Sequence, residues 1–161
     1  MKTVRKLLIG ILAMVALATT ARAQNGYLQD PRYGATPEER HENALMLNYF
    51  DDARKANRYD LATSYLHKLI ERNVSASQNL FINGANIYKT KISTSKSVEE
   101  KNAYVDTLMT IYDARAKHFG DNATRGRDYI LAQKANDYAS YRPADVENVL
   151  KLYREAIAAG G

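Results

Sequence analysis

Apolar side chains recur at helical spacing along most of this chain, and that spacing constrains the fold more than any other sequence feature. Six segments carry apolar residues three or four positions apart, as a helix with one buried face requires. Their apolar residues fall within 45–53, 61–70, 80–88, 104–112, 129–138 and 146–157. None of these segments shows the strict alternation that is typical of a half-buried strand. The sequence therefore predicts an all-α fold.

Capping signals mark the helix boundaries. Thr36-Pro37-Glu38-Glu39 combines an N-cap hydroxyl, a proline at the first helical position and the glutamate of a capping box. Ser97-Val98-Glu99-Glu100 is a second capping box. We also expect the fourth helix to stop at Gly120 and the sixth to start at Pro143.

The six expected helices group into three hairpins whose residues repeat along the chain. Leu66, Leu108 and Leu150 follow one another at intervals of 42 residues, so we expect them to be buried equivalents on the second helix of each hairpin. Hairpins near this period form a solenoid, in which each hairpin covers its apolar face against its neighbours. A simple six-helix bundle is the alternative, and the repeated spacing favours the solenoid.

Residues 57–69 resemble the turn and second helix of a tetratricopeptide repeat (TPR). In that family a short polar turn precedes a small residue, and a large apolar residue follows one turn later. Ala62 and Leu66 match those two places, and Gly84 matches the small residue where paired helices approach. The resemblance covers roughly residues 43–159. It implies a short right-handed α-solenoid of about three hairpins.

The repeat pattern is degenerate in places and extends to the last helix. Residues 145–156 resemble another second helix of the family, whereas Phe50 and Tyr104 stand where the family usually has a small residue. The leader, the tyrosine-rich helices and the segment 105–109 also resemble exported repeat proteins of Bacteroidota. This second resemblance implies a role in the cell envelope.

The first 23 residues have the organisation of a cleaved signal peptide. Residues 1–6 carry three positive charges, residues 7–18 are mostly apolar, and Ala21-Arg22-Ala23 supplies small residues where a signal peptidase reads them. A membrane anchor is the alternative, but a spanning helix needs about 20 apolar residues and this run is shorter. We therefore expect a mature chain that starts at Gln24 and is periplasmic, envelope-associated or secreted.

Residues 24–35 show neither helical nor strand periodicity, and their prolines and glycines are typical of irregular structure. We expect a flexible N-terminal segment that either lies loose or packs an aromatic ring against the first helix. The remaining residues, 36–161, form the predicted TPR-like domain.

Charge and residue counts exclude several function classes. The leader holds four basic residues and no acid, so its removal lowers the formal net charge from +5 to +1 and removes support for nucleic-acid binding. The chain has no cysteine, which excludes disulfides and a cysteine nucleophile. His41, His67 and His118 fall in three different predicted helices, whereas zinc needs three or four converging ligands. We expect no metal, no cofactor and no enzymatic activity.

Twelve tyrosines, against three phenylalanines and no tryptophan, are the most unusual compositional feature. One interpretation is helix packing with each hydroxyl reaching solvent. The other is a recognition groove, because tyrosine is enriched at binding hot spots. The TPR resemblance implies that the first helix of each hairpin lines a concave face. By helical phase, the candidate groove residues are Asp51, Arg54, Phe81, Tyr88, Lys89, Tyr129 and Asn136.

Three classes of function remain open at this point. The leading hypothesis is an exported non-enzymatic scaffold that binds a protein or peptide partner in the envelope. The second is a structural subunit of a larger envelope assembly with no ligand of its own. The third, which we favour least, is a protein that binds a small molecule or glycan.

The last helix carries more apolar residues than one narrow stripe needs. They are Val146, Val149, Leu150, Tyr153 and Ile157. A solenoid normally ends in a hairpin with a polar outer face. One alternative is that these residues all turn inward and that Glu147, Lys151, Arg154 and Glu155 form the polar cap. The other, which we favour, is that this helix pairs with a second copy, docks on a partner, or has lost a continuation present in a longer relative.

Overall fold

The computed structural model describes residues 26–161, and every element of that part of the chain is a helix. The all-α prediction is confirmed. The predicted signal peptide, 1–23, and the predicted mature start at Gln24 lie outside the described residues. The elements are η1 (Gly26–Gln29), η2 (Pro31–Tyr33), α2 (Pro37–Lys55), α3 (Tyr59–Glu71), α4 (Gln78–Ser93), α5 (Val98–Phe119), α6 (Arg127–Tyr141) and α7 (Val146–Ala159).

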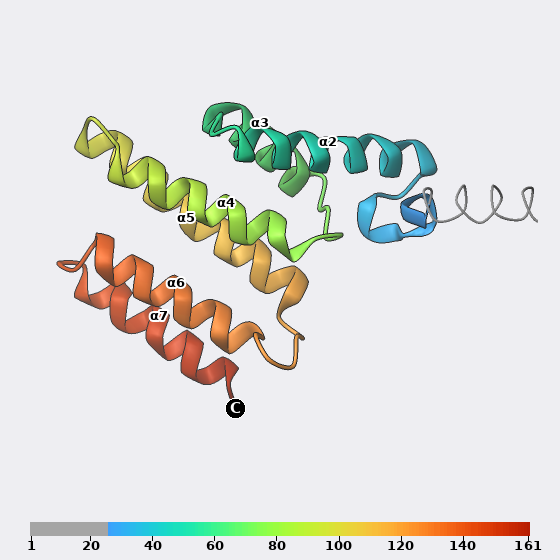
Figure 1. The fold of residues 1–161 in the computed structure, drawn as a ribbon. Coiled ribbons are helices and arrows are strands. Elements are labelled where there is room, and N and C mark those ends of the chain that lie inside the picture. The colour runs from blue at the N-terminus through green and yellow to red at the C-terminus, as the bar shows by residue number, and fades with distance from the viewer. Residues whose placement is uncertain (1–25) are drawn as a thin grey trace, which may run out of the picture.

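The six α-helices form three hairpins that follow one another in chain order (Figure 1). Helix α2 packs against α3, α4 against α5, and α6 against α7. Between hairpins, α3 contacts α4 and α5 contacts α6. The middle hairpin therefore has a neighbour on both sides, whereas the first and last hairpins each have one.

Helix starts follow the predicted capping residues. The hydroxyl of Thr36 accepts a hydrogen bond from the Glu39 amide at 3.2 Å, and the Glu39 carboxylate accepts one from the Thr36 amide at 3.3 Å. Ser97 accepts from the Glu100 amide at 3.0 Å in the same way. The Glu100 carboxylate, however, accepts from the amide of Lys96, one residue before the cap. In the second box the glutamate therefore accepts from the residue before the N-cap and not from the N-cap residue itself.

The other helix boundaries also agree with the sequence, except for the start of α7. Helix α2 stops just before Asn57, which has a φ of 56°, and α5 stops before Gly120. Helix α7 begins at Val146, so the prediction that Pro143 starts it is wrong. Pro143 lies in the preceding turn, because the side chain of Asp145 supplies the N-cap.

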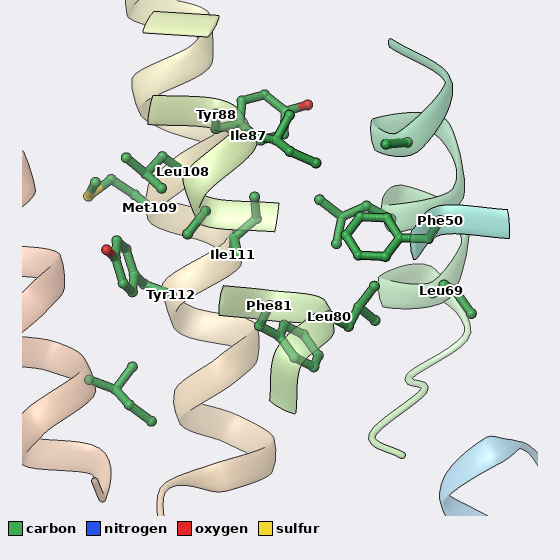
Figure 2. Close-up of a cluster of buried hydrophobic side chains, with 14 of the residues drawn as sticks. Phe50, Leu69, Leu80, Phe81, Ile87, Tyr88, Leu108, Met109, Ile111 and Tyr112 are labelled. Atoms are coloured by element: carbon green, nitrogen blue, oxygen red, sulfur yellow. The ribbon is translucent and has the colours of Figure 1, made fainter. Parts of the chain in front are cut away.

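One continuous apolar core runs through the three hairpins (Figure 2). Its largest fully buried side chains are Leu66, Leu69, Val74, Leu80, Phe81, Val105, Leu108, Ile111 and Ile130. Because the core is shared across all three hairpins, each hairpin depends on its neighbours for burial.

The predicted repeat register holds for the first two hairpins and fails in the third. Leu66 and Leu108 are fully buried, but Leu150 is 48% exposed, so the prediction that Leu150 is their buried equivalent is wrong. Leu152 and Val149 pack against the core instead. Leu152 follows Leu108 by 44 residues, two more than the predicted interval. A helix has about 3.6 residues per turn, so a shift of two residues places Leu150 on the side of α7 that faces away from the interface.

The described part of the N-terminal segment, 26–35, packs on the first helix. The Arg40 guanidinium donates to three backbone carbonyls of this segment at 2.8 Å each. The ring of Tyr27 stacks on His41 with centroids 5.9 Å apart, and its hydroxyl lies 2.6 Å from Nδ1 of that histidine. Of the two predicted alternatives, loose or packed, the structure shows the packed one.

Candidate functional site

A groove runs between α2 and α4, the first helices of two successive hairpins. It consists of two hollows of about 420 and 410 Å³ that share Arg54 and Asn83 as lining residues. We call it the α2/α4 groove and define it by Asn48, Asp51, Arg54, Asn79, Asn83 and Asn86.

Four of these lining residues are asparagines, and three of the four follow one another along α4. Within residues 26–161 none of the four side-chain amides has a hydrogen-bond partner; Asn48, Asn79 and Asn86 are exposed to solvent and Asn83 is half-buried. Most other asparagine side chains in that range are already engaged: Asn43, Asn57, Asn73, Asn122, Asn136 and Asn148. Unused amide groups therefore concentrate in the α2/α4 groove.

The spacing of these amides matches an extended peptide. A carboxamide offers donors and an acceptor, as a peptide group does. Asn79 and Asn83 are one turn apart, a rise of about 6 Å along the helix. Alternate residues of an extended chain are about 6.6 Å apart. A chain lying along α4 would therefore present successive outward peptide groups to Asn79 and Asn83.

The charged residues of the groove bind each other. Asp51 forms ion pairs with Arg54 and Lys55, both at 2.5 Å. Hydrogen bonds from Lys55 and then Arg54 hold the pKa of Asp51 below its usual range. One carboxylate thus faces two cations, so these three residues together carry a net charge of +1.

A smaller hollow of about 90 Å³ lies between α4, α5 and α6. Asn86 lines both this hollow and the α2/α4 groove, so the two adjoin. In the smaller hollow Lys89 pairs with Asp137 at 2.7 Å, and the Tyr112 hydroxyl donates to the same carboxylate at 2.6 Å. Burial and this bond to Asp137 raise the pKa of Tyr112.

The structure places the seven predicted groove residues in three different settings. Asp51, Arg54, Lys89 and Tyr129 line the hollows described above. The prediction is wrong for Phe81 and Tyr88, which are 0% and 5% exposed and belong to the core. Asn136 lines neither hollow, and its side-chain oxygen accepts from Tyr153 at 2.7 Å.

Sequence reasoning missed the asparagines of α4 and the buried Arg115 of the smaller hollow. The asparagines had a detectable signal, because positions 79, 83 and 86 share one helix face. Arg115 had none, since its burial depends on α6 packing over it.

The structure shows no metal site within residues 26–161, where no three histidine, aspartate or glutamate side chains converge. In the same range, no helix is long and apolar enough to cross a membrane. Comparisons with protein-family models, with curated proteins and with solved structures found no match to this chain.

Proposed function

We propose that this chain is an exported, non-enzymatic, TPR-like scaffold that binds an extended segment of a protein partner in the cell envelope. The observation that carries the proposal is the set of four unengaged asparagine amides in the α2/α4 groove. Their groups and spacing complement a peptide backbone, so recognition depends little on the side chains of the partner.

The arrangement of the hairpins supports the architectural part of this proposal. Three hairpins follow one another in chain order (Figure 1). Two successive first helices, α2 and α4, line the α2/α4 groove. A short right-handed α-solenoid with a concave face formed by its first helices has these features. The envelope location rests on the signal-peptide features of residues 1–23.

A peptide-binding experiment with a matched control tests the function. The triple variant Asn79→Ala, Asn83→Ala, Asn86→Ala removes the α4 amides, and Asn102→Ala removes an exposed amide on α5, outside the groove. We expect the wild type and Asn102→Ala to bind members of an immobilised library of unstructured peptides, and the triple variant to bind at least about tenfold more weakly. N-methylation of the backbone of a bound peptide should also weaken binding. Equal binding by the triple variant contradicts the proposal.

Helix α7 favours the second candidate function, a subunit of a larger assembly. Val146, Leu150 and Ile157 are 59%, 48% and 75% exposed. Their spacing places them along one side of the helix. Grouped apolar side chains of this kind mark association surfaces. We propose that α7 docks on a second copy or on another subunit, and sedimentation measurements test this.

A further inference from the structure

Arg115 of α5 is buried without a counter-charge. It is 4% exposed, and within residues 26–161 no carboxylate forms an ion pair with it. Nη1 donates to the side-chain oxygen of Gln133 at 2.9 Å, whereas Nε is buried with no partner among the described residues. Burial lowers the pKa of Arg115, since it disfavours the charged guanidinium.

A second cation lines the same hollow. The Arg125 guanidinium lies 5.7 Å from the centre of the Tyr129 ring, and it too has no ion pair within the described part of the chain. Lys89 is already neutralised by Asp137. The hollow between α4, α5 and α6 therefore carries two uncompensated positive charges, those of Arg115 and Arg125.

An uncompensated buried charge is unfavourable unless a bound group completes its interactions. The hollow measures about 90 Å³, compared with about 30 Å³ for each water molecule in the liquid. It has room for a small charged group and not for a folded segment. Arginine guanidinium groups bind phosphate oxygens through paired hydrogen bonds, and two arginines balance a doubly charged oxyanion.

We propose that the hollow lined by Arg115 and Arg125 binds a phosphate-type dianion, either as free phosphate or as the terminal group of a phosphate monoester. Arg115 supplies the buried guanidinium, Arg125 supplies the second charge from the rim, and Gln133 orients Arg115 through its Nη1 bond. This site is separate from the asparagines proposed to bind peptide, apart from Asn86 at the boundary between the two.

Thermal unfolding with inorganic phosphate tests the site, using sodium chloride at matched ionic strength as the reference. We expect phosphate to raise the Tm of the wild type in a saturable manner, as a ligand of the folded state does. Arg115→Met should abolish the rise. It should also leave the ligand-free Tm unchanged or higher, because it removes a buried charge that has no partner. Arg125→Gln should weaken phosphate binding about tenfold.

Arg154→Gln is the matched control, because it removes one exposed arginine on α7 without touching the hollow. Its phosphate response should equal that of the wild type. A wild-type response no larger than that to chloride overturns the proposal, as does an unchanged response in Arg125→Gln. The Arg125 variant alters an exposed residue, so it decides the question even if Arg115→Met does not fold.

Two further probes define the ligand. Acetate carries a single charge and should stabilise the protein less than phosphate, and an equal effect overturns the assignment to a dianion. Glycerol phosphate and inorganic phosphate distinguish the sources. Tighter binding of glycerol phosphate supports a monoester group, and tighter binding of inorganic phosphate supports the free ion.

Discussion

Gly84 of α4 lies so close to Leu66 of α3 that a Cβ on the glycine would come within 2.7 Å of Leu66 Cδ2. Both residues are buried, and this approach joins the first hairpin to the second. The TPR resemblance implied that Gly84 is the small residue at which paired helices approach each other. The structure shows that the helix it meets belongs to the preceding hairpin.

Gly84→Ala tests this approach. Alanine favours a helix over glycine by about 1 kcal/mol. Overpacking a core costs about 1–3 kcal/mol, and here the added methyl meets the end of a leucine side chain. We expect a net loss of about 1 kcal/mol in the free energy of unfolding, measured with urea. The loss should shrink or reverse in the Leu66→Ala background, where the methyl has room. A stabilised Gly84→Ala protein in the wild-type background argues against the close approach.

Alanine substitutions on the second helices test the repeat register. Leu108→Ala should cost about 2–5 kcal/mol, because Leu108 is fully buried. Leu150→Ala should stay within about 0.5 kcal/mol, since Leu150 is largely exposed. Leu152→Ala should fall between these values, because Leu152 is partly buried against the core. Urea unfolding measures the loss in unfolding free energy for all three variants. A larger loss for Leu150→Ala than for Leu152→Ala supports the predicted register, in which Leu150 is the buried residue.

The contact of Tyr112 and Lys89 with Asp137 links the second and third hairpins. Tyr112→Phe leaves the ion pair of Asp137 with Lys89 in place and should cost about 1 kcal/mol. Asp137→Ala leaves a buried hydroxyl without its acceptor and should cost about 1–3 kcal/mol. Denaturant titration compares the two variants. The reverse order contradicts the assigned role of Asp137.

His118 should make stability depend on pH. Burial, and then the nearby charge of Lys117, lower the pKa of His118 below its ordinary value of 6.5. The His118 imidazole therefore binds a proton less readily in the folded state than in the unfolded state. This contribution is fully present above pH 6.5 and is lost as the pH falls through the pKa of the folded state.

Urea unfolding of the wild type and His118→Gln from about pH 5 to about pH 8 measures this effect. The difference in unfolding free energy between the two proteins should shift against the wild type below pH 6.5. Lys117→Gln should reduce the shift, because it removes the second cause. Parallel pH profiles for wild type and His118→Gln contradict the prediction.

The exposed apolar side of α7 should govern self-association. Leu150→Glu with Ile157→Glu places charges on that side and should change stability by no more than about 0.5 kcal/mol, since both residues are exposed. Sedimentation at several concentrations should show association of the wild type and a monomeric double variant. Lys151→Glu, on another side of the same helix, is the control. A wild type that stays monomeric at all concentrations refutes this role.

Helix boundaries were largely predictable from the sequence because they depend on neighbouring residues. Thr36 caps α2 through a bond to Glu39, three positions away, and hydrophobic spacing identifies each helix without reference to any other. The error at Pro143 has the same local character. The proline favoured a start at Pro143, whereas the side chain of Asp145 caps α7 two residues later.

Tertiary packing decided which face of each helix meets a neighbour. The spacing along α4 placed Phe81 and Asn83 on different faces, but only the position of α3 and α5 sent Phe81 into the core and left Asn83 in the groove. Likewise, the packing of α7 on α6 leaves Leu150 exposed and places Leu152 against the core, where the sequence had predicted Leu150. Local hydrogen bonds and periodicity thus determined the helices by themselves. The groove and the burial of Arg115 depended on contacts between helices far apart in the chain, which no local pattern encodes.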